Sequence, residues 1–312
     1  MHDARRAARE ALGRYGIEGA RLRLLSRSEA TSYRVDAAGE RFLLRVQPAA
    51  DGRTAAQVAS EAAWTGALAR DTDLIVPTPV PTRDGEPVAR VRGRVCNLQR
   101  WVPGRAWRRE ARPSHLERLG RAMAALHAHG ARWTPPPGFE RPAWTADTIF
   151  GERGFLGAGD RNVWDLLPPG RAERLRPHAA WARGVLDGLD ARGLIHADLH
   201  FHNVVFAKGE ARPIDFDDCG TGPWAYDFAA SLERLRFRAD WPAPLTPFLR
   251  GYERERPAPR AHLDALDPAI AGRIVGLCLW VCMVAERRPA LRPKIAGWLD
   301  AFEGDLARLP LP

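Results

Sequence analysis

Residues 196–227 read HADLHFHNVVFAKGEARPIDFDDCGTGPWAYD, and this stretch decides the fold of the chain. It holds six acidic and two basic residues, so its charge is 2 − 6 = −4 within a protein of formal charge +9. The acids are Asp198, Glu210, Asp215, Asp217, Asp218 and Asp227. Clustered carboxylates repel one another unless a cation lies among them. The stretch therefore indicates a divalent metal.

Two kinds of metal are compatible with these residues. Three histidines near Asp198 offer nitrogen ligands for zinc. They are His196, His200 and His202. All share the parity of Asp198, so in a strand they would face one side, and the zinc motifs HxHxDH and HExxH are absent. The alternative is magnesium, with oxygen ligands from Asn203, Asp215 and Asp217, because magnesium takes few protein ligands and shares its other positions with substrate phosphates.

The composition is arginine-rich rather than simply basic. Of 47 Lys+Arg, only Lys208 and Lys294 are lysines, so 47 − 2 = 45 are arginines and none of the first 207 residues is a lysine. A biased genome explains this skew. The arginines are dispersed in runs no longer than a pair, and zinc-finger spacings and RNA-binding aromatic signatures are absent, so we expect no nucleic-acid partner.

The remaining numbers describe an ordinary globular chain. With 312 residues, 45% hydrophobic and 27% charged, it is long enough for one large domain or two lobes. Its most apolar stretch, Ile274–Ala285, is about half the roughly 20 residues of a membrane helix, so we expect a buried helix and no membrane partner. The charged N-terminus has no apolar signal region, and four scattered cysteines form no disulfide framework. We expect a cytoplasmic protein; its oligomeric state is not predicted.

The local patterns predict a strand-rich first part and a helical second part. In the first part we expect strands over 22–25, 33–35, 42–46, 87–91 and 94–99, and a helix over 55–70. In the second part, Ser114 and Glu117 form a capping box that opens a helix ending at Gly130. Residues 131–170 are irregular. They are followed by a helix over 171–192, short strands around 204–206 and 213–216, and helices to the end.

The order and spacing of the polar residues resemble a known family. Asp198, Asn203 five residues later, a short hairpin and then Asp215-Phe216 match the protein-kinase catalytic loop and metal-binding aspartate. The forms HADLHFHN and IDFDD are similar to those of the aminoglycoside phosphotransferase and choline kinase-like family, nearest the subgroup of stress response kinase and homoserine kinase type II. The resemblance implies an α+β, two-lobed protein-kinase-like fold. Residues 1–98 would form a nucleotide-binding N-lobe with an antiparallel sheet and a helix, and residues 105–312 a larger, mainly helical C-lobe with the catalytic loop and acceptor site. Residues 99–104 would be the hinge between them.

The resemblance also implies roles in the catalytic loop. Asp198 would accept or orient the proton of the acceptor hydroxyl. Asn203 and Asp215 would hold Mg²⁺ against the phosphates of ATP. Asp217 occupies the position of the glycine in the DFG motif of protein kinases, and whether it is a third metal ligand is left open. The remaining residues have less specific expectations. His196 and Asp227 would fix the loop or serve as a core histidine and a helix cap, and His200 and His202 would contact substrate or only form the loop.

For the N-lobe, the resemblance implies that Arg45 contacts the phosphates in place of the usual lysine and pairs with Glu61. The guanidinium group of arginine is a planar fork and the ammonium group of lysine a compact point charge, so the two side chains would bind phosphate with different geometry. No GxGxxG is present; the phosphate loop would be the small residues Ser28, Thr31 and Ser32. The hinge residues that contact adenine would be Gln99, Arg100 and Trp101.

The short interval between Asp217 and Asp227 leaves no room for the activation loop of regulated protein kinases. We therefore expect an ATP- and Mg-dependent phosphotransferase acting on a hydroxyl of a small molecule: a sugar, amino alcohol, amino acid or antibiotic. A stress-response-type Ser/Thr protein kinase and a nucleotide-binding pseudokinase are the alternatives. The irregular stretch 133–165 is long enough to be functional. Its tryptophans would line the acceptor site or merely pack on one another: Trp133, Trp144 and Trp164.

Overall fold

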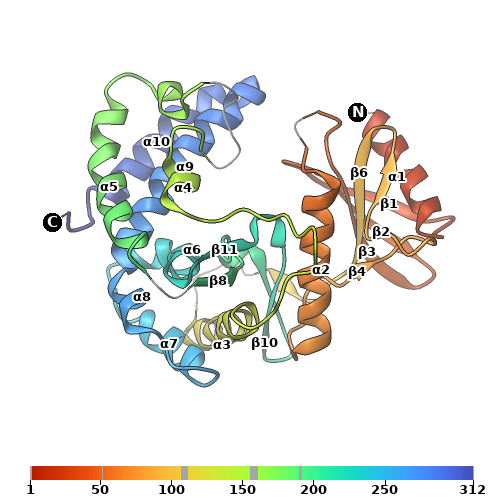
Figure 1. Ribbon diagram of the computed structural model, residues 1–312, viewed down its shortest axis with the longest axis horizontal. Coiled ribbons are helices and arrows are strands. Elements are labelled where there is room, and N and C mark those ends of the chain that lie inside the picture. Colours follow the sequence, from red (N-terminus) through yellow and green to blue (C-terminus); the bar gives the residue numbers. More distant parts are fainter. Residues whose placement is uncertain (1, 51, 107–111, 155–160, 190–191, 312) are drawn as a thin grey trace. The chain divides into compact units, whose positions relative to one another are not determined.

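The computed structural model of the protein describes residues 2–50, 52–106, 112–154, 161–189 and 192–311 (Figure 1). The chain forms two units. The first consists of Met1–Trp107, Trp133–Arg141 and Asn203–Asp217, and the second of Arg108–Arg132, Pro142–His202 and Asp218–Pro312. The first unit thus includes two segments, 133–141 and 203–217, that the sequence-based boundaries assign to the C-lobe.

The first unit is built on an antiparallel sheet with strand order β1-β2-β3-β6-β4, and β5 also pairs with β6. The strands are β1 (Arg21–Arg27), β2 (Thr31–Ala37), β3 (Glu40–Val46), β4 (Pro79–Val80), β5 (Ala89–Val91) and β6 (Arg94–Arg100). The predicted strands of this region are confirmed. Helix α1 (His2–Arg14), which the sequence patterns missed, contributes Ala7, Ala8 and Leu12 to the core of the sheet.

Side chains alternate across strand β3, and this alternation separates the core from the site. Leu44 pairs in register with Leu98 and belongs to the core that includes α1. Arg45, the next residue, contacts helix α2 (Ala55–Asp71) on the other face of the sheet (Figure 1). Successive residues of a strand point to opposite faces. A single strand therefore places an apolar side chain against α1 and a charged one toward α2.

Helix α2 begins with a capping box that the sequence analysis did not identify. The Thr54 side chain accepts from the backbone N–H of Gln57, and the Gln57 side chain accepts from the backbone N–H of Thr54. Such reciprocal bonds satisfy two donors that a helix start leaves unpaired. The capping box expected at Ser114 is wrong: α3 (Pro113–Gly130) starts one residue earlier, and Pro113 in its first turn sets the start instead.

A second, three-stranded sheet completes the first unit. Its order is β10-β9-β7, with β7 (Arg105–Ala106), β9 (Val204–Ala207) and β10 (Glu210–Pro213). Strand β9 confirms the strand predicted around 204–206, but the strand predicted around 213–216 is misplaced. Strand β10 ends at Pro213, because Asp215 has a φ of 64° and Phe216 begins a turn of 3₁₀ helix. Asn203 lies directly before β9 and Asp215 two residues after β10, and the N–H of Ile214 donates to the Asn203 carbonyl at 2.9 Å. The hairpin thus brings together two polar residues that are twelve positions apart.

The second unit is mainly helical, with a two-stranded sheet of β8 (Arg192–Ile195) and β11 (Gly220–Pro223). Besides α3, its helices are α4 (Ala146–Phe150), α5 (Arg171–Leu186), α6 (Trp224–Arg236), α7 (Leu245–Glu253), α8 (Arg260–Asp264), α9 (Leu266–Arg287) and α10 (Arg292–Leu306), with short turns of 3₁₀ helix between them. Helix α5 ends earlier than expected, because β8 begins at Arg192. The two antiparallel sheets of the first unit and the helices of the second confirm the predicted α+β class.

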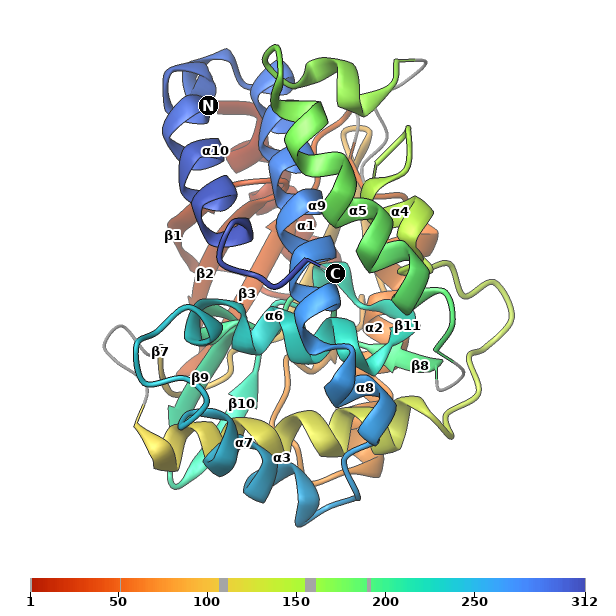
Figure 2. The ribbon, with the colours of Figure 1, turned by 90° about the vertical axis from the view of Figure 1, so that its left-hand side faces the viewer.

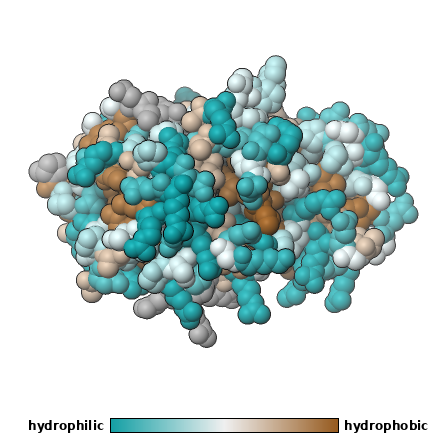
Figure 3. Space-filling model, turned by 90° about the horizontal axis from the view of Figure 1, so that it is seen from below, coloured by the Kyte–Doolittle hydropathy of each residue, from teal (hydrophilic) through white to brown (hydrophobic). Residues whose placement is uncertain are grey.

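The apolar helix α9 is the centre of the second unit. It packs against α5, α6 and α10, and Figure 2 shows it between α5 and α10. Within the described residues it is the one helix long and apolar enough to cross a membrane by length and composition, but 83% of its most apolar window is buried inside the structure. The expectation of a buried core helix is confirmed. Large apolar side chains are seldom exposed elsewhere, and the face in Figure 3 is mostly hydrophilic.

Helices α3 and α7 cross at two glycines, Gly120 and Gly251. A Cβ atom on Gly120 would overlap the carbonyl oxygen of Phe248, and one on Gly251 would overlap that of Glu117. The backbones approach so closely that neither site accepts a side chain, and rigid backbone cannot move aside at low cost.

We predict that Gly120→Ala lowers the free energy of unfolding by about 1–3 kcal/mol, because the added methyl group forces the two helices apart. Gly297→Ala in α10 is the matched control. A Cβ there meets no atom within 4 Å, so the better helix propensity of alanine should raise stability by up to about 1 kcal/mol. Urea unfolding measures both; equal effects of the two substitutions would contradict the close crossing.

Candidate active site

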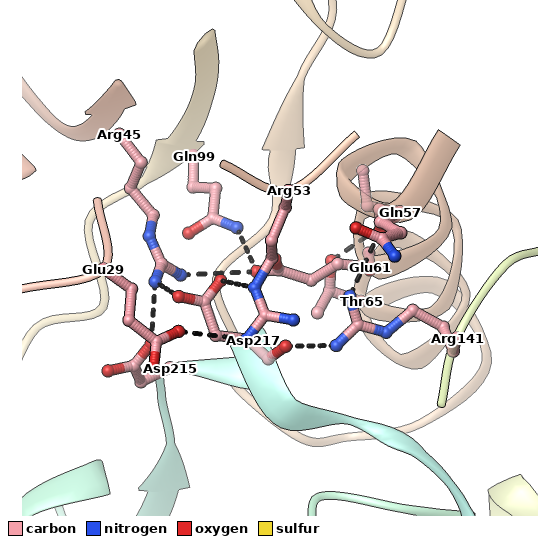
Figure 4. Close-up of polar contacts among 11 residues, drawn as sticks. Glu29, Arg45, Arg53, Gln57, Glu61, Thr65, Gln99, Arg141, Asp215 and Asp217 are labelled. Carbon is pink, nitrogen blue, oxygen red and sulfur yellow. Dashed lines mark hydrogen bonds and ion pairs between the residues drawn. The ribbon is translucent and has the colours of Figure 1, made fainter. Parts of the chain in front are cut away.

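Arg45 is the cationic centre of a charged cluster in the first unit (Figure 4). Its Nη1 lies 3.6 Å from Oε1 of Glu61, and its Nη2 lies 3.1 Å from Oδ1 of Asp215 and also contacts Oδ2 of Asp217. The Arg45 side chain is only 7% exposed. Its Nε donor is buried without a hydrogen-bond partner among the described residues. An unpaired buried donor is costly, so a site of this kind suits an anionic ligand.

Glu61 is fixed from two elements. Its side chain is 2% exposed on α2, and its Oε1 accepts from Nε2 of Gln99 in β6 at 3.0 Å. The Gln99 side chain thus points at the ion pair of Arg45 and Glu61 rather than at a free edge of the sheet. The backbone N–H groups of Arg100 and Trp101 donate to the carbonyls of Thr78 and Arg41.

Asp215 and Asp217 differ in exposure although they are two residues apart. The Asp215 side chain is 48% exposed and that of Asp217 14%. Asp215 also has a φ of 64°. Of the five described non-glycine residues with positive φ, three precede a glycine in a tight turn, which leaves Ala197 and Asp215. Backbone strain outside turns is typical of functional sites.

Two further arginines in this cluster were missed by the sequence analysis. Arg53 lies between β3 and α2; its Nη2 is 3.3 Å from Oε2 of Glu29, and its Nε is 3.9 Å from Oδ1 of Asp217. Arg141 donates to the backbone carbonyls of Asp217 and Gln57, the latter at 3.3 Å. In a chain of 45 arginines no sequence signal distinguishes these two; only the fold does.

The oxygen donors suited to a metal are the exposed carboxylate of Asp215 and the amide of Asn203, which is 8% exposed. This set fits magnesium, which takes few protein ligands. Within the described residues, no group of three His, Cys, Asp or Glu side chains is arranged to hold a metal ion. The ring of His200 instead contacts the carboxylate of Asp198, and His196 is fully buried.

Asp198, in the second unit, has both carboxylate oxygens engaged. Arg273 of α9 donates from Nη2 to Oδ1 at 2.5 Å, and Nε2 of His200 lies 3.3 Å from Oδ2. Nδ1 of His200 accepts from the N–H of His202 at 3.1 Å, which leaves Nε2 as the nitrogen that carries the proton. Burial raises the pKa of Asp198, but the charge of Arg273 and the bond from His200 outweigh it, and the pKa falls well below its usual value. Asp198 is therefore ionised.

Arg273 was also missed by the sequence analysis. It is 6% exposed, and it donates to Glu233 at 3.0 Å and to the carbonyl of Ala197 at 3.1 Å besides Asp198. Three directed bonds from one planar guanidinium fix the orientation of the carboxylate that it holds. Its sequence position, directly before the apolar stretch Ile274–Ala285, indicated only the boundary of a buried helix.

The backbone of residues 196–197 is held by Asp227 of α6. Its fully buried carboxylate accepts from the N–H of His196 at 3.0 Å and of Ala197 at 2.6 Å. Nε2 of His127 lies 3.0 Å from the same carboxylate, and Nδ1 of His127 lies 2.9 Å from the hydroxyl of Tyr252. Burial, against the opposing effect of Asp227, lowers the pKa of His127, so the ring is neutral. Asp227 thus fixes the turn that precedes Asp198.

The remaining expected site residues are distributed over both units. Ser28 lies in the turn between β1 and β2, and Thr31 and Ser32 begin β2, where Ser32 pairs in register with Arg45. His202 is exposed. The tryptophans do not form one group. Trp133 packs against Phe139 in the first unit; in the second, Trp144 donates to the carbonyl of Asp218 and Trp164 to that of Phe150. The last two are buried packing residues.

Comparison with known proteins supports a phosphotransferase site. Residues 21–263 match the phosphotransferase enzyme family. A homoserine kinase of Acidiphilium cryptum (strain JF-5) is 31% identical over 212 residues; the match covers 66% of this chain and 63% of that protein. The structure of a microcompartment-associated aminopropanol kinase is 28% identical, with a TM-score of 0.81 over 98% of this chain and 99% of that chain. An amicoumacin kinase solved with AMP-PNP and Ca²⁺ shares the fold, at 19% identity and a TM-score of 0.73 over 91% of this chain and 88% of that chain.

The neutral state of His127 predicts how stability depends on pH. Its pKa is lowered in the folded state, whereas an unfolded histidine titrates near 6.5. Below about pH 6.5 the unfolded chain binds a proton that the folded chain does not, so stability decreases as pH falls. His115 and His178 have lowered pKa values for the same reason, burial, and act in the same direction.

We therefore expect the melting temperature to fall between pH 7.5 and pH 5.5, and to fall less in His127→Gln. His202→Gln, which removes an exposed histidine, is the control and should keep the wild-type dependence. A His127→Gln variant that loses as much stability on acidification as the wild type would show that folding does not lower the pKa of His127.

Proposed function

The chain belongs to the phosphotransferase enzyme family, and we propose that it transfers the γ-phosphoryl group of ATP to a hydroxyl of a small amino alcohol, with Mg²⁺ as cofactor. The observation that carries this proposal is the buried ion pair of Arg45 and Glu61 next to the exposed carboxylate of Asp215. The pair presents an unpartnered guanidinium donor at a site with a half-exposed carboxylate, which suits a nucleotide phosphate and its metal.

Arg45 binds phosphate in this proposal, and Glu61 with Gln99 keeps its side chain aimed at the site. Asn203 and Asp215 hold the magnesium ion, which when bound neutralises charge on the phosphates. The small residues Ser28, Thr31 and Ser32 cover the phosphates. Adenine is expected at the hinge. The backbone N–H groups of Arg100 and Trp101 already donate to Thr78 and Arg41, so their carbonyl groups and the residues that follow would contact the base.

Asp198 orients the acceptor hydroxyl. An ionised carboxylate with a strongly lowered pKa is a weak base, so it takes the proton late, when the phosphoryl group has largely moved. Late proton transfer is compatible with the loose transition state of phosphoryl transfer. His200, which donates to Asp198 in this tautomer, orients the carboxylate and is not itself the base.

The acceptor class follows from the relatives. The homoserine kinase and the aminopropanol kinase are both named for compounds that carry an amine and a hydroxyl. The aminopropanol kinase supports the proposal most, because its likeness extends over 98% of the chain. Aminopropanol and homoserine are therefore the first acceptors to test, with propanol as the control that lacks the amine.

With Mg-ATP and the acceptor that the wild type phosphorylates best, we expect Asp198→Asn to lose activity by about 10²–10⁴-fold. The variant should keep the thermal stabilisation that nucleotide gives, because Asp198 does not bind ATP in this mechanism. A coupled ADP-release assay and melting curves with AMP-PNP measure the two effects. If the wild type neither binds a nucleotide nor phosphorylates any of these acceptors, the proposed function is wrong.

The charge of Arg273 should set the acid limb of the pH profile. In Arg273→Gln the partly buried Asp198 loses the cation that lowers its pKa, so log kcat/KM should begin to fall at a higher pH than in the wild type. Arg273→Lys keeps the charge and should restore most of the wild-type profile. A loss of activity without any shift of the acid limb would assign Arg273 a structural role only.

A further inference from the structure

The carboxylate of Asp217 lies between two guanidinium groups (Figure 4). Its Oδ2 contacts Arg45, and its Oδ1 lies 3.9 Å from Nε of Arg53. All three side chains are at most 14% exposed. Ion pairs as shielded as this one are screened much less by water and salt than surface pairs. Asp217 is therefore in direct contact with Arg45 and forms a longer ion pair with Arg53.

Two of the three carboxylates of the IDFDD motif, those of Asp215 and Asp217, thus have different partners. Asp217 faces arginines from both of its oxygens, and Arg141 binds its backbone carbonyl. Asp215 is about half exposed and pairs with Arg45 through Oδ1 alone. To coordinate a metal, Asp217 would have to give up its contacts with two buried cations, whereas Asp215 has an accessible carboxylate. The geometry favours Asp215 as the metal ligand and gives Asp217 another role.

Arg53 also connects this cluster to the turn between β1 and β2. Its Nη2 lies 3.3 Å from Oε2 of Glu29, the residue after Ser28, and Glu29 is 32% exposed. A guanidinium with five donors can hold two carboxylates at once, and phosphate oxygens match the same fork. Arg53 is thus paired with one anion in the interior of the cluster and another on the expected phosphate loop.

We propose that Arg53 is a second phosphate-binding residue beside Arg45, and that Asp217 is an internal anion that holds both guanidinium groups until the phosphates of a nucleotide replace it. This inference rests on the proposed phosphotransferase function and extends it. The exchange conserves charge pairing: each arginine trades a carboxylate oxygen for a phosphate oxygen, and no buried cation is left unpaired. Glu29 is released from Arg53 when the phosphates bind, which lets the β1–β2 turn close over them.

Asp217 could be an internal anion, as proposed, or a metal ligand, and the two roles predict different effects of its removal on ADP binding. An internal anion competes with phosphate, so Asp217→Asn should bind ADP more tightly than the wild type in EDTA, by about fivefold or more. It should also keep the wild-type ratio of the ADP dissociation constants with and without Mg²⁺. Asp215→Asn, which removes the proposed metal ligand, should lose that ratio.

Arg53→Gln tests the second half of the proposal. We expect it to weaken ADP binding about tenfold in EDTA and to weaken AMP binding much less, because AMP lacks the terminal phosphate. Arg53→Lys keeps the positive charge and should recover part of the loss. Arg90→Gln is the matched control, since it removes an exposed arginine of β5 from the same unit and should leave ADP binding unchanged. Isothermal titration calorimetry measures all variants, with melting curves as the check on folding.

Three results would overturn the inference. One is an Asp217→Asn variant whose metal-free ADP affinity equals or falls below that of the wild type. Another is the loss of the Mg²⁺ effect in Asp217→Asn, which would make Asp217 a metal ligand. The third is equal weakening of AMP and ADP in Arg53→Gln. Each of these leaves the proposed function intact as long as the wild type binds Mg-ADP; failure of the wild type to bind any nucleotide would contradict the function itself.

Discussion

The hydrogen bonds to the buried carboxylate of Asp227 are the interaction on which the position of Asp198 in the second unit depends. This carboxylate accepts two backbone N–H groups, from His196 and Ala197, and fixes Ala197 at a φ of 66° directly before Asp198. A buried charge without hydrogen bonds would be strongly unfavourable. Here the two N–H groups and the ring of His127 satisfy it. The conformation of the catalytic loop is therefore set from helix α6, by a residue that touches no substrate in the proposed mechanism.

The sequence predicted the elements that carry a repeated pattern or a motif. The hairpins of the first sheet, helix α2, strand β9 and the buried helix α9 all have strong local signals. Residue types that are rare in this chain were also informative. Asn203 is one of only three asparagines; it is 8% exposed and lies at the start of the hairpin that precedes Asp215. Helix α1 was missed, because its core-facing residues are mainly small alanines between charged side chains and give only a weak apolar pattern.

The partners of these residues were not predictable from the sequence, for a physical reason. Arg53, Arg141 and Arg273 act through contacts with residues 75 or more positions away, or across a turn whose path is set by the tertiary fold. Their type carries no information in a chain with so many arginines. The wrong capping box at Ser114 has a similar origin, since a local signal competed with Pro113, which is better suited to a first turn.

The use of arginine in place of lysine has a consequence for the resting protein. A buried lysine can lose its proton and become neutral, but a guanidinium remains charged at any accessible pH. An arginine-based phosphate site must therefore contain an anion at all times, because a buried cation without a partner costs several kcal/mol, on the order of 3–5. Arg45 meets this requirement with Glu61, Asp215 and Asp217, and Arg53 with Asp217 and Glu29. Of the three aspartates in IDFDD, Asp215 would supply the carboxylate for a metal and Asp217 the carboxylate for the arginines. In the proposed scheme Asp217 is the anion that the two permanently charged guanidinium groups share before a nucleotide binds.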